Sequence, residues 1–511
     1  MKSIQFLFYA VVAGVVALTS CAEETTEDYD KFESQSLEAY ITQNKPELLA
    51  NFQPVGKSGY YVEVIEEGDK DASPIGAGDM WLSYNFSGRS LDGSIVLTRN
   101  ADEAKLLNTF TRYTHYVPFY RYCGADGADI QEGVYLAMRN ELSLDNGARK
   151  IKLREGSKVV LYLPSLLVGS NGLEGSGGYE GETSLASGRP LRVELEICDT
   201  VKNPLELEGS QVDYFCEENG GREEPKKNDS ENSSTKQEQL APTDPKHPYN
   251  LVNRWVIAKD SIAQLYVNLR YDPAKDRLKY PKSDKYKMKP YEVSPYNDAG
   301  LEEKIAQALV KRFHSEEAYA GVATLDADSV GLNKTAKIWY IGRFLDGFIF
   351  DTNINEVKEL IYGSGYTAGE AIEYTPSSGG LISAFYYTVP NLKFGQWATF
   401  ITTSTNGYGS AGQNGSSTTS SSGGISADYY DYLNYLSYYN SYYNNYYSGY
   451  YGGYYGGYGG YYGGYYDDYY SGYYDSAITT TTTTTVTTEI PSYCPLIFQI
   501  YIEPDNSTED Y

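Results

Sequence analysis

Residues 338–353 read IWYIGRFLDGFIFDTN, and this stretch does most to decide the fold. Residues 335–342, which include its first part, are rich in the β-branched and aromatic side chains that strands favour. We therefore expect this stretch to lie in a β-sheet.

Further segments of the same kind occur on both sides of it. We expect strands within residues 59–69, 80–88, 150–169, 189–199, 254–272, 398–404 and 495–503. A helix is predicted at 301–313 because apolar residues recur there every four positions. Residues 217–249 are rich in charge and proline and lack aliphatic side chains, which indicates a disordered linker. The chain is therefore predicted to be α+β, with two mostly-β domains that each contain a helix or two.

The composition argues against several classes of function. With 68 acidic and 42 basic residues the formal net charge is −26, so no basic surface is expected to bind nucleic acid. The three histidines are scattered and no cysteines form a CxxC pair, which argues against a metal site or a histidine-centred triad. We expect neither a metal nor a cofactor. Cys198 and Cys216 could pair in an exported protein, and unpaired thiols are an equal alternative.

The N-terminus resembles that of an exported lipoprotein. Residues 1–21 contain one lysine, an apolar run and a small-residue end, which are features of a secretory signal. Their last four residues, Leu-Thr-Ser-Cys, resemble the lipobox of bacterial lipoproteins. That resemblance implies cleavage before Cys21 and its lipidation, so that acyl chains hold the protein to a membrane. The acidic residues that follow resemble those of lipoproteins of gut Bacteroidetes, which implies the outer membrane, on its periplasmic or cell-surface face.

Three ordered segments resemble FKBP-type peptidyl-prolyl isomerases. Residues 338–353 resemble the family's first hairpin, where a tyrosine and a glycine precede Leu-Asp-Gly and Phe-Asp. Residues 381–412 resemble its next segment, with an apolar pair opening a short helix, a glycine turn, a strand and a Tyr-Gly loop. Residues 489–503 resemble its last strand. The resemblance implies a curved antiparallel sheet wrapped on a short helix.

The resemblance also implies a pocket for a prolyl ring. The pocket positions fall on Tyr340, Phe350, Asp351, Ile382, Phe385, Tyr408 and Phe498, with Leu381 and either Tyr374 or Ile372 as further substrate contacts. Turning an X–Pro amide must overcome a barrier of about 18–20 kcal/mol, and an apolar aromatic cup favours the less dipolar twisted state. By resemblance, the Ile382 N–H and the Tyr408 hydroxyl receive substrate carbonyls, and Asp351 orients the substrate at the rim.

Two positions depart from the family pattern. The pocket floor is usually tryptophan, and here it is Phe385, which predicts a shallower floor and weaker activity. Gln413 stands where another rim residue is common. The alternative interpretation is that these aromatic side chains only form the core of a small sheet domain.

The first half of the chain repeats the same plan. LSYNFSGRSLDGSIVLTRN, residues 82–100, keeps the glycine and the Leu-Asp-Gly triplet. In place of the pocket residues it has Phe86, Val96, Leu97 and, in the last strand, Val193. Because the aspartate and the loop tyrosine are both missing, we expect a degenerate domain that serves as a scaffold.

These observations predict six segments. They are a signal peptide (1–21), a tether (22–51), a degenerate FKBP-like domain (52–200), a disordered linker (201–250), and an isomerase domain (251–505) with a low-complexity insertion (413–489). The insertion contains the tyrosine and glycine tract at 446–475. We expect it to form a disordered or loosely collapsed lid over the pocket, and a repeat expansion without a role is an equal alternative.

The expected function is that of a lipid-anchored, exported peptidyl-prolyl isomerase or isomerase-like chaperone. Its partners would be proline-containing protein clients and, through Cys21, a membrane. Two alternatives stay open: a protein-binding module without catalysis, and an adhesive surface lipoprotein that acts through its tyrosine tract. The sequence gives no indication of the oligomeric state.

Overall fold

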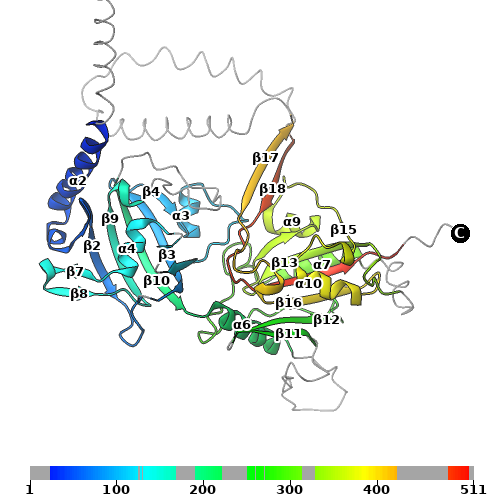
Figure 1. The fold of residues 1–511 in the computed structure, drawn as a ribbon. Coiled ribbons are helices and arrows are strands. Elements are labelled where there is room, and N and C mark those ends of the chain that lie inside the picture. The colour runs from blue at the N-terminus through cyan, green and yellow to red at the C-terminus, as the bar shows by residue number, and fades with distance from the viewer. Residues whose placement is uncertain are drawn as a thin grey trace, which may run out of the picture.

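The computed structural model describes residues 24–76, 78–124, 127–128, 130–168, 190–220, 250–258, 261–269, 271–313, 328–422 and 481–505. Within these ranges the chain forms two large antiparallel sheets that lie next to each other (Figure 1). The predicted signal peptide and Cys21 lie outside the described residues. No helix in the described part of the chain is long and apolar enough to cross a membrane.

The first sheet has the strand order β1-β2-β9-β10-β3-β5-β6, with β4 paired to β3. Its strands are β1 Phe52–Val55, β2 Ser58–Glu67, β3 Met80–Ser90, β4 Ile95–Thr98, β5 Phe119–Gly124, β6 Gly127–Ala128, β9 Ser157–Leu163 and β10 Leu191–Val201. Every second residue of β10 is buried, as the alternation in its sequence predicts. The shorter elements are α3 Ala101–Leu106, α4 Glu132–Arg139, α5 Ser165–Val168 and the hairpin of β7 Leu142–Leu144 with β8 Arg149–Ile151.

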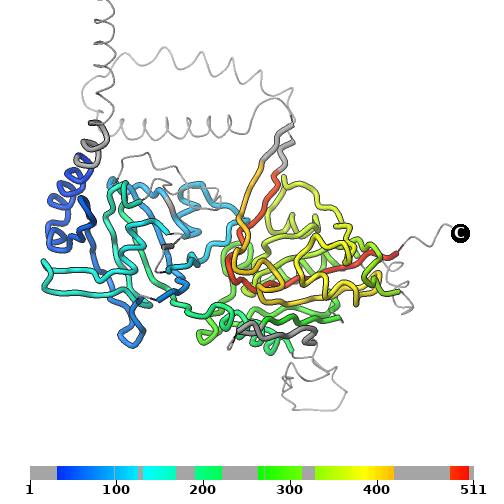
Figure 2. The backbone as a smooth tube through the Cα atoms, viewed as in Figure 1, coloured from blue at the N-terminus to red at the C-terminus, as the bar shows by residue number. Residues whose placement is uncertain are grey.

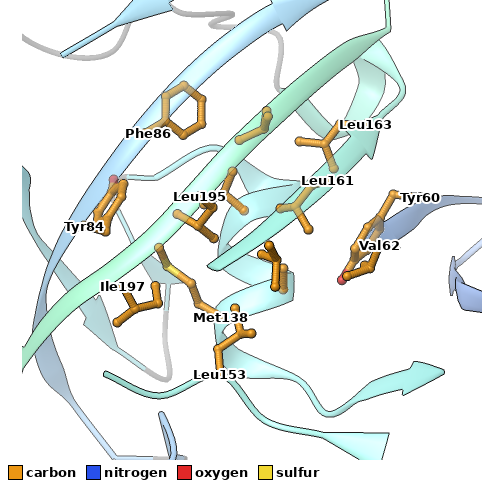
Figure 3. Close-up of a cluster of buried hydrophobic side chains, with 14 of the residues drawn as sticks. Tyr60, Val62, Tyr84, Phe86, Met138, Leu153, Leu161, Leu163, Leu195 and Ile197 are labelled. Atoms are coloured by element: carbon orange, nitrogen blue, oxygen red, sulfur yellow. The ribbon is translucent and has the colours of Figure 1, made fainter. Parts of the chain in front are cut away.

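The core of this sheet lies between its strands and α4. Leu161 of β9 and Leu195 of β10 face Met138 of α4 in Figure 3, and all three side chains are at most 2% exposed. Burying each such side chain stabilises the fold by about 1.5–3 kcal/mol. The sheet and this helix therefore form one packed unit.

The predicted tether is wrong over most of its length. Helix α2 spans Glu24–Asn44, and a short 3-10 helix, η1 Pro46–Asn51, follows it. Leu37 and Ile41 of α2 pack against Tyr162 of β9 and are buried. Leu37 and Ile41 therefore lie on one face of α2, and the first sheet covers that face.

The predicted linker is also wrong at its N-terminal end. Residues Pro204–Glu218 form helix α6, whose Val212, Phe215 and Cys216 are fully buried against the second sheet. The remainder of that prediction, residues 221–249, lies outside the described residues. Within the described residues Cys198 and Cys216 form no disulfide, so the structure does not support that pairing.

The second sheet has the order β11-β12-β16-β19-β13-β14, with β15 paired to β13. Its strands are β11 Asn250–Ala258, β12 Ser261–Asn268, β13 Ala336–Phe344, β14 Ile349–Thr352, β15 Ile372–Tyr374, β16 Trp397–Thr402 and β19 Leu496–Ile502. Its helices are α7 Leu301–Phe313, α9 Asn355–Tyr362 and α10 Ser383–Thr388, with the 3-10 turns η3 Pro376–Ser378, η4 Val389–Asn391 and η5 Ser404–Asn406. The helix expected at 301–313 is confirmed at those bounds.

The two sheets share one pattern of strand pairing. In the second sheet Gly342 pairs with Asp351 and with Phe498, and the ladder shifts immediately after the glycine. In the first sheet Gly88 pairs with Leu97 and with Val193, and the ladder shifts at the corresponding place. This correspondence places the repeat seen in the sequence on matching strands.

The predicted insertion begins with an ordered strand pair. Strands β17 Ser416–Ser422 and β18 Thr481–Thr487 form an antiparallel ribbon that projects from the second sheet (Figure 1). A bridge between Gln413 and Ile490 closes its base, with two backbone hydrogen bonds of 2.8 Å. Residues 423–480, including the tyrosine and glycine tract, lie outside the described residues.

The two halves of the chain touch around the base of this ribbon (Figure 2). The carboxylate of Glu489 accepts ion-paired hydrogen bonds from Arg99 and Arg121 of the first half, at 3.3 and 3.0 Å. His115 lies 2.6 Å from the carboxylate of Asp346, which belongs to the second Leu-Asp-Gly triplet. The first half thus contacts the segment that leads into β19.

Candidate functional site

A cluster of aromatic rings lies in the core of the second sheet. The ring of Phe498 lies 5.6 Å from that of Phe350 and 6.1 Å from that of Tyr340. Gly342 lies on β13, between β14, which carries Phe350, and β19, which carries Phe498. A Cβ atom there would come within 2.6 Å of the Phe350 ring and 3.1 Å of the Phe498 ring. Glycine is therefore required where these two rings meet.

Helix α10 supplies the floor of the cluster. The Phe385 ring lies edge-on to those of Phe498 and Phe400, at 5.1 Å from each. The Tyr374 ring is 6.3 Å away, and its hydroxyl is buried with no hydrogen-bond partner within the described residues. Edge-to-face packing of this kind contributes about 0.5–1.5 kcal/mol per pair beyond area burial. The result is a nearly continuous apolar wall.

The N-terminus of α10 presents a free backbone donor. Ile382 is the N-cap residue, with φ −58° and ψ 151°, and its carbonyl accepts a hydrogen bond of 3.0 Å from the Phe385 N–H. Within the described part of the chain, no hydrogen bond from the Ile382 N–H is formed. The side chains of Ile382 and Leu381 are partly buried against the same core. A carbonyl oxygen placed at this helix end would find an unused N–H group.

Asp351 lies at the margin of the aromatic cluster. It accepts a hydrogen bond of 2.5 Å from the Tyr340 hydroxyl. Burial raises the pKa of the Asp351 carboxyl, and the hydrogen bond from Tyr340 and the charge of Lys358 oppose that effect. Burial, followed by the charge of Asp351, raises the pKa of Tyr340. The pair therefore has a fixed arrangement in which the tyrosine donates and the carboxylate accepts.

Tyr408 approaches the same region from the turn after η5. Its side chain is partly buried against the core that holds Phe350 and Phe498. Burial raises its pKa, and the charge of Asp351 raises it further. No hydrogen bond from the Tyr408 hydroxyl is formed to any described residue.

The structure thus brings the predicted site residues together. Tyr340, Phe350, Tyr374, Leu381, Ile382, Phe385, Tyr408 and Phe498 belong to one core or pack against it, and Asp351 joins them through its hydrogen bond with Tyr340. Ile372, the alternative to Tyr374, also packs against this core. Gln413 instead closes the base of the ribbon through its backbone. In the described ranges, no group of three or more histidine, cysteine or acidic side chains could hold a metal ion.

Sequence reasoning missed the polar groups that support Asp351 and Tyr340. Asn353 accepts a hydrogen bond of 2.7 Å from the Tyr340 N–H and donates to the carbonyls of Ile338 and Glu370. Lys358 lies on α9, where burial lowers its pKa against the raising effect of Asp351. The signal for Asn353 was its place at the end of the hairpin stretch. Lys358 gave no signal, since only the fold brings α9 to this rim.

Comparison with known proteins returns only weak structural likenesses. No family model and no curated protein matches the chain. Among solved structures, it is similar to FkpA from Escherichia coli at 16% identity and a TM-score of 0.21, over 39% of this chain and 72% of that one. It is also similar to the three FKBP domains of wheat FKBP73, at 11% identity and a TM-score of 0.19, over 89% and 98% of the two chains.

A peptidyl-prolyl cis-trans isomerase from Pseudomonas syringae is a third structural neighbour. It is 15% identical with a TM-score of 0.19, over 34% of this chain and 96% of that one. The structural neighbours are FKBP-type proteins. Their TM-scores are too low to carry an argument, so the architecture stands on the strand orders, registers and ring contacts described above.

Proposed function

We propose that the chain is an FKBP-type peptidyl-prolyl cis-trans isomerase that acts on X–Pro bonds of protein clients. The second sheet with α10 forms the isomerase domain, and 413–489 is an insertion in its pocket loop. The first sheet is a degenerate domain of the same kind, because Leu97 stands where the second sheet has Asp351. Its role is that of a scaffold.

The combination of an apolar cup with unused donors at its margin carries this proposal. The packed rings of Phe350, Phe385 and Phe498 would offer a prolyl ring and its twisted amide a weakly polar surface. The Ile382 N–H and the Tyr408 hydroxyl have no partners among the described residues. These two donors fit carbonyl oxygens on either side of the turning bond. No acid, base or nucleophile is needed for this reaction.

An isomerisation assay tests the function directly. We expect the full chain to accelerate cis–trans exchange of a proline peptide, followed by NMR exchange spectroscopy. Tyr408→Phe and Asp351→Ala should each lower kcat/KM about tenfold, the cost of one lost hydrogen bond in a desolvated site. Tyr40→Phe, a change of the same type on α2, should have no effect. A wild-type rate equal to the uncatalysed rate would exclude the enzyme and leave a peptide-binding module.

We also propose that lipidated Cys21 holds the protein to the outer membrane, on its periplasmic or cell-surface face. The resemblance of residues 18–21 to a lipobox supports this. Cys21→Ser should move the protein from the membrane fraction to the soluble fraction, because one or two acyl chains supply the membrane affinity. Fractionation and the mass of the N-terminal peptide check the prediction. Unchanged sedimentation of the serine variant, or an unmodified cysteine, would contradict it.

A further inference from the structure

Glu208 of helix α6 is a buried carboxylate without a cationic partner among the described residues. Its side chain is 1% exposed. One oxygen accepts a hydrogen bond from the Ser404 N–H and the other accepts one from the Ser404 hydroxyl, each at 2.9 Å. Burying a charge in this way is costly unless its hydrogen bonds are well made. Both donors come from one residue of the second sheet, 196 positions away in the sequence.

Ser404 in turn holds the turn that carries Tyr408. It begins η5, and its carbonyl accepts hydrogen bonds of 2.8 Å from the N–H groups of Gly407 and Gly409. These two glycines flank Tyr408. Gly409 has φ +64°, a conformation that glycine adopts without strain. Tyr408 therefore lies in a short turn. The residues directly before and after it both donate a hydrogen bond to the Ser404 carbonyl.

We propose that Glu208 is a positioning residue for the candidate site: its carboxylate fixes Ser404 and, through the Ser404 carbonyl, the turn that presents Tyr408. Helix α6, which lies between the two sheets in the sequence, then determines the position of Tyr408 beside the aromatic cluster. This proposal deepens the proposed function, and its effect on catalysis rests on that function. Its effect on the turn does not.

The chemistry of the contact explains why a carboxylate is used. Ser404 offers two donors, and an ionised carboxylate offers an acceptor to each. Glutamine would offer one acceptor, and its NH2 group would be received only if the Ser404 hydroxyl turned from donor to acceptor. Protonation would likewise remove part of the acceptor capacity. Burial raises the pKa of Glu208 to about 7 although both hydrogen bonds from Ser404 oppose the effect, so the hold on the turn changes within the neutral range.

Two other titratable groups face Glu208. The charge of Glu208 raises the pKa values of Tyr120 on β5 and of Cys494, in both of which burial is the larger cause. Both groups are therefore neutral around pH 7. A change in the turn near that pH then belongs to Glu208 and not to these neighbours.

Hydrogen exchange and kinetics of the full chain test the proposal. At pH 8, Glu208→Gln should speed amide exchange in a peptide covering residues 404–409 by about tenfold, the effect of losing one buried hydrogen bond. The same change should lower kcat/KM by about fivefold in the wild-type background, and cause no further loss in a Tyr408→Phe background. Asp199→Asn is the matched control, because Asp199 is a buried carboxylate just before α6 that pairs with Lys287 and not with Ser404. It should leave exchange at 404–409 unchanged.

Each result distinguishes a positioning role of Glu208 from an alternative without that role. Unchanged exchange at 404–409 in Glu208→Gln would overturn the proposal, as would equal losses of activity with and without the Tyr408 hydroxyl. Faster exchange in Glu208→Gln alone supports the proposal. If exchange rises while wild-type protein shows no isomerisation, the positioning of the turn stands and the isomerase function fails.

Discussion

Replacing Arg343 by methionine should lower the free energy of unfolding of the second sheet by about 3–5 kcal/mol, the usual cost of breaking a buried ion pair from one side. The Arg343 side chain is 0% exposed. It donates to Glu302 at 2.6 Å, to the Gln499 side chain at 2.9 Å and to the Tyr280 hydroxyl at 2.9 Å. Methionine keeps the apolar stem of the side chain but lacks the guanidinium group, so the loss comes mainly from the polar groups left without a partner.

Helix α7 provides a matched control. Arg277 pairs at 2.9 Å with Glu303, the residue next to Glu302, and this pair is partly exposed, at 33% and 57%. Exposed pairs of this kind contribute about 0–1 kcal/mol. Urea denaturation of wild type, Arg343→Met and Arg277→Met, followed by tryptophan fluorescence, measures the difference. Similar losses in the two variants would show that burial of Arg343 does not determine its contribution.

This expectation came only from the structure, whereas the strands could be predicted from the sequence. Strands β13 and β19 lie where β-branched and aromatic residues are concentrated in the sequence, and almost every residue of both strands is buried. The internal repeat could also be predicted from two glycines. Gly342 and Gly88 pair with corresponding positions in the last strand of their own sheets. Short-range patterns were sufficient here because a strand's faces are set by its own residues.

Long-range packing could not be predicted in the same way. Charge and proline at residues 217–249 suggested a linker, placed at 201–250, yet α6 within it buries three side chains against the second sheet. The tyrosine and glycine tract suggested an unstructured insertion, yet β17 and β18 pair at the base of that insertion. In both cases the partner lies far away in the sequence, so local composition carried no signal.

The candidate site shows the same division. The aromatic residues could be named because their spacing matched a family pattern. The hydrogen bond between Tyr340 and Asp351, and the hold of Glu208 on Ser404, depend on side-chain directions that spacing does not give. Positioning groups are therefore the part of a site that most needs coordinates.

The second large effect concerns pH. Burial raises the pKa of Glu208 to about 7, above its ordinary value of 4.5. Between these two values the folded chain keeps a proton that the unfolded chain has released. The free energy of unfolding should therefore fall as pH rises from about 5 to 7 and level off above 7. The fall should approach about 3 kcal/mol, since one pKa unit corresponds to about 1.4 kcal/mol.

Comparison of wild type with Glu208→Gln isolates this contribution, because other titrating groups act in both proteins. The difference in free energy of unfolding, measured with urea at pH 5, 6, 7 and 8, should change across the interval in favour of the glutamine variant as pH rises. Asp199→Asn should give a difference curve without a step near pH 7. A flat difference for Glu208→Gln would mean that the carboxylate is ionised throughout. In that case the two hydrogen bonds from Ser404 would outweigh the cost of burial, and the turn at Tyr408 would be held equally firmly at every pH from 5 to 8.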